Sequence, residues 1–362
     1  MIQMYINKSN ATQILTHGSS PFAFYVRPNE IFDRRQTDIP VERLPWFEPF
    51  CMTNVLNANE VTLVREYALG DLIQLIPIAR QLKKINNKHL NIATTQRFVG
   101  CLRKMFEDLN FITTEKLNCA KLGIKIHLNG ILERDHSLNN PDRNLHRVDI
   151  YSKFFGLKVE ELDWSLKMQN TPEKMFFKEN EKVIALQIRG SGAMKTLPHD
   201  FIKKIAFAIV QMGYKVLLID QDKGMGFDGE NIINACGKMD VIDIVTNLQK
   251  CKCVITMDSG VLWLAHVANC PVLTFLGSTR EAERMSLHPQ YPEKARSINL
   301  SEHVGCTPCF ETRVRCKGSI DCMNKFNRDT ILKEVIQNLK IILKGDENGQ
   351  KEETDLFAGI FD

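Results

Sequence analysis

Hydrophobic and polar positions follow one repeating order over most of the chain, in which a short apolar run precedes a longer amphipathic stretch. In the first half, amphipathic helices are expected at Asp71–Ile85 and around Arg97–Asp108. The apolar runs around them have the length and β-branching of strands, and they are VTLVRE (61–66), LNIATT (90–95), FITTE (111–115) and IKIHLNG (124–130). Strands that alternate with helices predict a doubly wound α/β domain.

The same order begins again in the second half. The expected elements are a strand at Val183–Ile188, a helix at His199–Met212, a strand at Lys215–Ile219, a helix at Val241–Cys251 and a strand at Val254–Met257. This repetition predicts two facing Rossmann-like domains. Ligands of such sheets bind beyond the carboxyl ends of the strands, so the predicted site is the cleft between the two halves.

The ends of the chain differ from this pattern. Residues 1–59 consist of short extended runs broken by Asn, Gly, Ser and Pro, which predict a small β-rich appendage. Residues 60–172 and 173–345 are the two expected Rossmann-like domains, and residues 346–362 form an acidic tail.

Composition narrows the class of protein. The chain has 362 residues, of which 44% are hydrophobic and 25% charged, so it can bury a core in each of several domains. Its net charge of +4 suits anionic ligands but is far from that of a dedicated nucleic-acid binder. The N-terminus lacks the order of a signal peptide, and no apolar run approaches the roughly 20 residues of a membrane span. We therefore expect a cytoplasmic protein without stable membrane insertion.

The segment from Cys253 to Ser278 carries the clearest ligand signal. Its first apolar run ends abruptly in Asp258-Ser259-Gly260, where a helix begins. Asp258 or Ser259 can cap that helix, and the positive end of the helix dipole, approached closely over a glycine, suits a phosphate group. An ordinary cap before a buried helix would show the same pattern.

Gly70-Asp71 occupies the matching place in the first half, between a predicted strand and a predicted helix. A carboxylate at this turn could accept a proton from a hydroxyl nucleophile. Taken alone, Asp71 is better explained as a helix cap than as a catalytic base. Pro77 lies inside the predicted helix, where it predicts a kink or a local break.

Four of the 11 cysteines lie close together in the sequence CTPCFETRVRCKGSIDCM, namely Cys306, Cys309, Cys316 and Cys322. A CxxC pair followed by two further cysteines fits a tetrahedral four-thiolate metal site. Disulfides are the alternative, which a reducing cytoplasm disfavours. Iron and zinc are both acceptable in such a structural site.

In their order along the chain these motifs resemble the heptosyltransferases, inverting glycosyltransferases of the GT-B fold (glycosyltransferase family 9). The motifs are Gly70-Asp71 with Pro77, Lys195-Thr196-Leu197-Pro198, Asp258-Ser259-Gly260 with His266, and Gly277-Ser278-Thr279. The resemblance covers roughly Val61 to Lys344. Each motif is weak alone, but four in this order are fairly specific.

The resemblance implies a nucleoside-diphosphate sugar donor held by the second domain, an acceptor held by the first, and no metal requirement for transfer. By position, Asp71 would be the general base and Lys195 would stabilise the leaving diphosphate. The remaining donor-binding candidates are Arg189, Asp258, Ser259, Gly260, His266, Gly277 and Ser278. The acidic residue that usually contacts the donor could be Asp220 or Asp222, with Gln221 between them, so the donor stays open.

A similar cysteine finger, which binds iron, occurs in the heptosyltransferases that modify bacterial autotransporter proteins. These relatives also have a β-rich N-terminal part, so the hydroxyl of a saccharide or of a protein is the expected acceptor. Two other functions fit the sequence: a glycosyltransferase acting on hydroxymethylated DNA bases, and a noncatalytic binding module that retains the fold. The sequence leaves the oligomeric state open.

Overall fold

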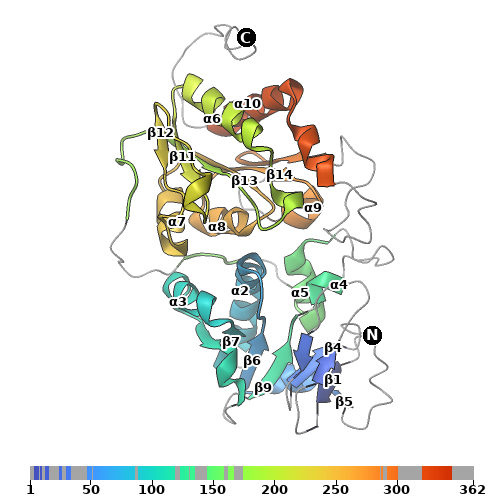
Figure 1. Cartoon of the computed structure of the whole chain (residues 1–362). Coiled ribbons are helices and arrows are strands. Elements are labelled where there is room, and N and C mark those ends of the chain that lie inside the picture. Colours follow the sequence, from blue (N-terminus) through green and yellow to red (C-terminus); the bar gives the residue numbers. More distant parts are fainter. Residues whose placement is uncertain are drawn as a thin grey trace. The chain divides into compact units, whose positions relative to one another are not determined.

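The structure is a computed structural model of the whole chain (Figure 1). It describes residues 4–7, 9, 13–15, 24–26, 30–33, 47–50, 52–85, 89–118, 123–129, 131–134, 145–158, 162–166, 174–285, 287, 292–300 and 320–344. The chain divides into two compact units, Met1–Asn170 and Thr171–Asp362.

A fully parallel six-stranded sheet forms the centre of the second unit. Its strands are β10 (Val183–Gln187), β11 (Lys215–Ile219), β12 (Ile232–Asn234), β13 (Cys253–Met257), β14 (Val272–Leu276) and β15 (Ala295–Asn299). They lie in the order β12-β11-β10-β13-β14-β15, which is the Rossmann order 3-2-1-4-5-6. Every residue of β10, β13 and β14 is buried, as expected for strands covered on both faces.

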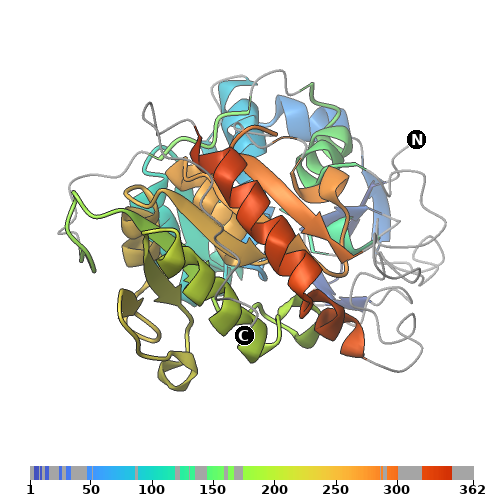
Figure 2. The same ribbon diagram turned by 90° about the horizontal axis from the view of Figure 1, so that it is seen from above.

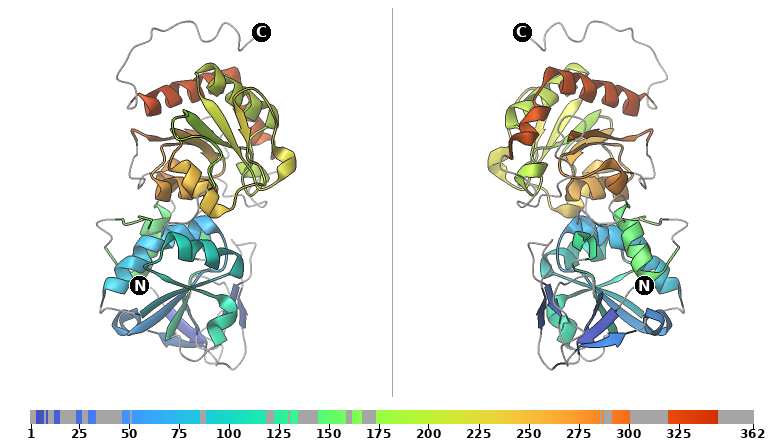
Figure 3. Two further views of the ribbon diagram at one scale, coloured as in Figure 1. Left: turned by 90° about the vertical axis from the view of Figure 1, so that its left-hand side faces the viewer. Right: turned by 90° about the vertical axis from the view of Figure 1, so that its right-hand side faces the viewer.

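Helices cover both faces of this sheet. Figures 1 and 3 show α6 and α10 on one face and α7 and α8 on the other, and Figure 2 shows α10 crossing the sheet. The bounds are α6 His199–Gln211, α7 Val241–Leu248, α8 Gly260–Ala268, α9 Glu281–Arg284 and α10 Asp329–Leu343, with 3₁₀ turns η6 Ala193–Lys195, η7 Lys223–Met225 and η9 Ile320–Phe326. A capping box between Asp240 and Asp243 starts α7. The α/β architecture with a parallel sheet that the sequence predicts for this half is confirmed.

The first unit contains a seven-stranded sheet in the order β5-β1-β4-β9-β6-β7-β8. Its strands are β1 (Met4–Asn7), β4 (Glu30–Asp33), β5 (Phe47–Phe50), β6 (Glu60–Val64), β7 (His89–Thr94), β8 (Asn110–Thr113) and β9 (Ile124–His127). Strands β4, β9, β6, β7 and β8 run parallel, whereas β1 is antiparallel to both β4 and β5. A separate pair joins β2 (Gln13–Leu15) to β3 (Phe24–Val26).

The prediction of a separate N-terminal appendage is wrong, although its β-rich character is confirmed. Strand β4 pairs with β9 through Ile31 and Ile126, and β1 and β5 extend the sheet beyond it. Hydrogen bonding of β4 to the edge of the parallel strands makes β1, β4 and β5 part of the first unit's own sheet. Short antiparallel strands give no sign in the sequence of the distant strand with which they pair.

Helix α2 (Leu69–Lys84) runs through Pro77 as one element, so the predicted local break is absent. A proline costs about 3 kcal/mol in a helix interior. Burial outweighs that cost, because Ile73, Ile76 and Ile78 are each 0% exposed and each contributes about 1.5–3 kcal/mol. The other helices of this unit are α1 Met52–Asn57, α3 Gln96–Met105, α4 Ile131–Arg134, α5 Arg147–Phe155 and the 3₁₀ turn η4 Thr114–Asn118, and α5 packs beside α2 (Figure 1).

Within the part of the chain that the structure describes, every helix is too short or too polar to cross a bilayer.

Candidate active site

The best-defined site of the second unit lies at the point where its strand order reverses. Strands β10 and β13 are neighbours in the sheet, yet their connections lead away in opposite directions. The loops after two such strands diverge at their carboxyl ends, which is where open α/β sheets bind ligands. Lys195 follows β10 and Asp258 follows β13, so the fold brings these two predicted residues together, with Lys195 Nζ 3.7 Å from Asp258 Oδ2.

The loop that carries Lys195 is fixed by its own backbone. Arg189 and Thr196 form an antiparallel bridge, and the amide of Gly190 donates to the carbonyl oxygen of Lys195 at 2.8 Å. Lys195 ends the 3₁₀ turn η6, and its amide donates to Gly192 O at 2.9 Å. The ammonium group therefore extends from a closed loop.

Arg189 contacts a carboxylate of its own unit. Its guanidinium makes two hydrogen bonds to Asp220, from Nε to Oδ2 at 2.9 Å and from Nη2 to Oδ1 at 2.7 Å. Hydrogen bonding to Asp220 raises the pKa of Arg189. Asp222 lies further out, with a side chain 59% exposed against 3% for Asp220, so of the two acidic candidates Asp222 is the more accessible.

Helix α8 begins directly after Asp258. Ser259 is its N-cap, and the Oγ of Ser259 accepts from the amide of Val261 at 3.2 Å. The same hydroxyl donates to Gln187 Oε1 at 2.7 Å, while Gln187 Nε2 donates to Arg189 O at 2.7 Å. Gln187, which the sequence analysis did not select, thus connects the loop after β10 to the start of α8.

The glycines of the site differ in what surrounds them. A Cβ on Gly260 would have no protein atom within 4 Å, so the first turn of α8 faces open space. A Cβ on Gly277 would lie 2.5 Å from Met194 O and 2.7 Å from Met323 Sδ. Gly277 therefore permits close packing of the loop after β14 against the turn that carries Lys195, whereas Gly260 leaves room beside a helix N-terminus.

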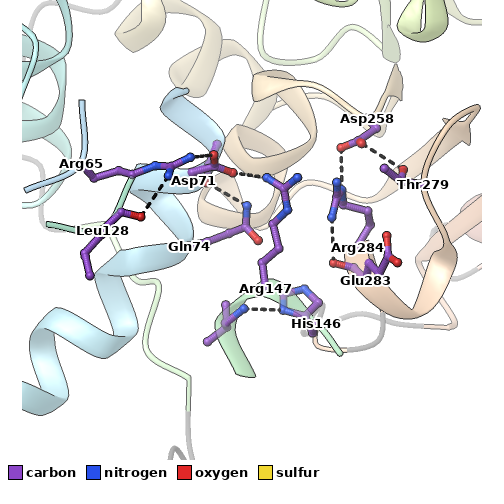
Figure 4. Close-up of polar contacts among 12 residues, drawn as sticks. Arg65, Asp71, Gln74, Leu128, His146, Arg147, Asp258, Thr279, Glu283 and Arg284 are labelled. Carbon is purple, nitrogen blue, oxygen red and sulfur yellow. Dashed lines mark hydrogen bonds and ion pairs between the residues drawn. The ribbon is translucent and has the colours of Figure 1, made fainter. Parts of the chain in front are cut away.

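Asp258 is 4% exposed and is surrounded by donors (Figure 4). Its Oδ1 accepts from Arg284 Nε at 2.8 Å, and its Oδ2 accepts from Thr279 Oγ1 at 3.0 Å. Thr279 follows the predicted Gly277-Ser278 pair, of which Ser278 is 1% exposed. Arg284, at the end of α9, was missed because a charged run of this kind usually marks a solvent-exposed face.

His266 lies within α8, away from its first turn. The residue is 4% exposed, and its ring packs on Trp263 with 4.7 Å between the centroids. The prediction that His266 contacts the donor stays a prediction, and this packing provides a structural role for the ring.

The first unit has its own reversal point, between β6 and β9. Asp71 lies in the first turn of α2, which follows β6, and is 5% exposed. Arg65 Nη2 donates to Asp71 Oδ2 and Arg147 Nη1 donates to Asp71 Oδ1, so each carboxylate oxygen has an arginine partner (Figure 4). Both oxygens of the carboxylate are therefore held by ion pairs.

The two arginines hold Asp71 from different elements. Arg65 is 1% exposed, follows β6, and also donates from Nη1 to Leu128 O at 3.2 Å, which ties it to the end of β9. Arg147 is the first residue of α5, and its side chain is 15% exposed. The sequence analysis selected neither Arg147 nor Arg65.

The turn before Asp71 is strained. Ala68 has φ 64°, a conformation that L-residues with a side chain rarely adopt. Its carbonyl accepts from the amides of Asp71 and Leu72 at 3.1 and 3.2 Å, so this conformation starts the helix. Such strain clusters at functional sites, which supports the choice of the Gly70-Asp71 turn as one.

The predicted metal ligands lie outside the residues whose surroundings the structure describes. Cys306, Cys309 and Cys316 fall in the undescribed segment 301–319, and Cys322 lies in η9 with its side chain undescribed. Among the described residues, no group of three His, Cys, Asp or Glu side chains is arranged to hold a metal ion. The acidic tail 346–362 is likewise outside the described part.

Parts of the sequence are similar to known glycosyltransferases. Residues 143–319 match the model of glycosyltransferase family 9 (heptosyltransferase). This part of the chain is therefore similar to the glycosyltransferases of family 9. Over 122 residues the chain is 28% identical to lipooligosaccharide heptosyltransferase 2 of Haemophilus influenzae, an alignment that covers 31% of this chain and 34% of that protein. The chain thus spans about a third of the length of this family 9 relative.

Solved structures of glycosyltransferases extend the likeness to the fold of most of the chain. The iron-containing dodecameric glycosyltransferase TibC of enterotoxigenic E. coli H10407 aligns with a TM-score of 0.61 at 17% identity, over 93% of this chain and 91% of that one. A family 9 glycosyltransferase of Veillonella parvula aligns with a TM-score of 0.55 at 15% identity, over 78% and 97%. The predicted GT-B-like α/β fold with parallel sheets is confirmed.

Proposed function

We propose that this protein is an inverting glycosyltransferase that moves a sugar from a nucleoside-diphosphate donor to a hydroxyl of a bacterial saccharide or protein. The observation that carries the proposal is the arrangement around Lys195. Its ammonium group, the N-terminus of α8 and the open space at Gly260 are adjacent at the carboxyl ends of β10 and β13. A diphosphate requires a cation and backbone N–H donors, because negative charge develops on it as the sugar leaves.

Asp71 is the proposed general base. Its carboxylate takes the proton of the acceptor hydroxyl while the hydroxyl oxygen attacks the anomeric carbon, from the face opposite the diphosphate. The new C–O bond forms as the bond from the anomeric carbon to the diphosphate oxygen breaks, so the configuration inverts. Arg65 holds one carboxylate oxygen from a buried position, which fixes the direction in which the base points.

The donor is proposed to be an ADP-sugar of the heptose type. TibC has been crystallised with ADP-D-β-D-heptose, and that complex aligns with this chain at a TM-score of 0.60. Asp222, exposed after β11, is the proposed acidic contact to the nucleoside. Lys195 and the α8 N-terminus would recognise only the diphosphate, so the identity of the donor's nucleobase and of its sugar must be found by experiment.

A donor screen tests this function. The purified protein is incubated with UDP-, GDP-, ADP- and CMP-linked sugars, including ADP-heptose, and thermal unfolding is followed. A ligand at about 100 times its dissociation constant stabilises the folded state by roughly 2.7 kcal/mol. We expect one nucleoside-diphosphate sugar to raise the unfolding temperature and to be transferred or slowly hydrolysed. No shift with any donor and no turnover would contradict the proposal.

The four cysteines are proposed to bind a structural metal, with iron as the first candidate because TibC is iron-containing. Elemental analysis of protein purified without added metal should give one ion per chain. Cys306→Ser combined with Cys309→Ser should abolish it, whereas Cys236→Ser, at a buried cysteine of the second unit, should not. Full metal content in the double variant would refute the four-thiolate site.

Self-association is proposed on the same likeness, because TibC is dodecameric. Light scattering at micromolar concentration should give a mass several times that of one chain. A monomer at every concentration would contradict it.

A further inference from the structure

In the part of the chain that the structure describes, the cationic groups of Arg284 and Lys195 lie at different distances from the carboxylate of Asp258. Arg284 Nε lies 2.8 Å from Oδ1, within hydrogen-bonding distance, and its side chain is 2% exposed. Lys195 Nζ lies 3.7 Å from Oδ2, beyond hydrogen-bonding distance, and that oxygen instead accepts from Thr279 Oγ1 at 3.0 Å. The buried arginine is therefore the principal partner of Asp258.

Arg284 is held in place for this contact. It ends the short helix α9, which follows β14, and Ser297 of β15 donates from Oγ to Glu281 Oε1 at 2.7 Å at the start of that helix. Glu283, the adjacent carboxylate in the chain, accepts from the amide of Arg280 at 3.3 Å, and its backbone oxygen accepts from Arg284 Nη1 at 3.4 Å. Arg284 thus connects the segment after β14 to the loop after β13 (Figure 4).

The negative charge of Asp258 would oppose the binding of a diphosphate beside Lys195 unless another group neutralised it. A carboxylate beside a diphosphate repels it, and a carboxylate without another partner would draw the lysine ammonium toward itself, since buried charges must be paired. A hydrogen-bonded guanidinium 2.8 Å away removes both effects. The lysine can then direct its donors toward an anion.

We propose that Arg284 is a positioning residue, which neutralises Asp258 so that Lys195 presents its ammonium group to the donor diphosphate. The inference rests on the proposed donor site, but it assigns a role to a residue that does not touch the donor. This role differs from that of a residue that contacts the phosphate directly, because the effect of Arg284 depends entirely on the presence of the Asp258 carboxylate.

A double-mutant cycle separates these roles. Binding of inorganic pyrophosphate is measured by titration calorimetry for the wild type, Arg284→Met, Asp258→Asn and the double variant. We expect Arg284→Met to weaken binding at least tenfold, and the double variant to bind several times more tightly than Arg284→Met because the unpaired Asp258 carboxylate is gone. Arg284→Lys, which keeps the positive charge, should bind better than Arg284→Met.

The outcomes distinguish the inference from the function on which it rests. A double variant as weak as Arg284→Met would overturn the positioning role and leave the donor site intact. A wild type that binds neither pyrophosphate nor any nucleoside diphosphate would overturn the donor site and the inference with it.

A substitution at a second buried arginine serves as the control for a general loss of stability. Arg80 is 5% exposed and makes two hydrogen bonds to Asp108 in the first unit, each at 2.8 Å. Arg80→Met should lower the unfolding temperature yet leave pyrophosphate affinity unchanged. If Arg284→Met fails to fold, Arg284→Lys and the double variant carry the test, since each retains a balanced charge at Asp258.

Discussion

The amide of Gly190 donates to the carbonyl oxygen of Lys195 at 2.8 Å, closing the loop that presents the lysine. A Cβ on Gly190 would overlap that oxygen and would lie 2.5 Å from the Cβ of Lys195. The glycine is therefore required by the approach of the two strands of the bridge, and Lys195 cannot keep its position if residue 190 has a side chain.

Gly190→Ala should weaken the binding of pyrophosphate at least tenfold and lower the free energy of unfolding by about 1–3 kcal/mol, the usual cost of overpacking. Calorimetry and urea unfolding measure the two effects. Gly100→Ala is the matched control, because Gly100 lies within α3, where an added Cβ would have no atom within 4 Å. That control should gain about 0.5–1 kcal/mol and bind normally. Unchanged affinity in Gly190→Ala would show that the loop does not set the position of Lys195.

Unlike Gly190→Ala, Gly260→Ala should weaken ligand binding without lowering stability. The residue opens α8, and a Cβ there meets no protein atom, so the variant should fold with unchanged or slightly raised stability. If the open space receives the donor diphosphate, the added methyl group should weaken pyrophosphate and nucleotide binding by about tenfold or more, since close approach to the helix N-terminus is blocked. Wild-type affinity would place the diphosphate elsewhere.

Asp71→Asn should abolish transfer while leaving donor binding nearly intact. The amide keeps the shape of the side chain but cannot accept the acceptor proton, so kcat should fall about 100- to 10,000-fold. Donor affinity is measured separately by calorimetry, because the proposed donor-binding residues belong to the second unit. Glu107→Gln, at an exposed residue after α3, is the matched amide control and should keep full activity. Normal turnover by Asp71→Asn would exclude it as the base.

The sequence predicts those strands and helix starts that depend on neighbouring residues in the chain. Strands β10, β11 and β13 are continuous apolar runs because parallel strands are buried on both faces, and Ser259 follows such a run with the side chain of an N-cap. Lys195 and Asp258 were selected by resemblance, and the strand order explains why they meet.

The parts that were missed depend on contacts between distant residues. Arg284 reaches Asp258 across 26 positions, and Arg147 reaches Asp71 across 76. The local pattern of hydrophobic and polar residues cannot predict a contact between residues so far apart in the chain. Pro77 is the complementary case, since the local rule allowed a kink or a break, and the helix continues through Pro77 without a break among buried isoleucines.

The buried cysteines of the second unit should make stability depend on alkaline pH. Burial raises the pKa of Cys253 to about 12 and that of Cys236 to about 11, and it also raises the pKa of Cys251 and Cys270. In the unfolded chain these thiols ionise near the ordinary value of 9.0. The folded state, which keeps them protonated, is therefore fully stabilised below about pH 9 and loses that contribution as the pH rises toward 12.

Two measurements check this dependence. The free energy of unfolding in urea should fall between pH 9 and 11, and Cys253→Ala should reduce the slope while lowering stability at every pH. Labelling with iodoacetamide at pH 8, mapped by mass spectrometry, should be far slower at Cys253 in the folded protein than in urea, because the thiol is 0% exposed and burial raises its pKa. Cys101, only partly buried on α3, provides the reactive reference within the same sample. Equal rates at Cys253 in folded and unfolded protein would mean that the strand opens far more readily than its burial implies.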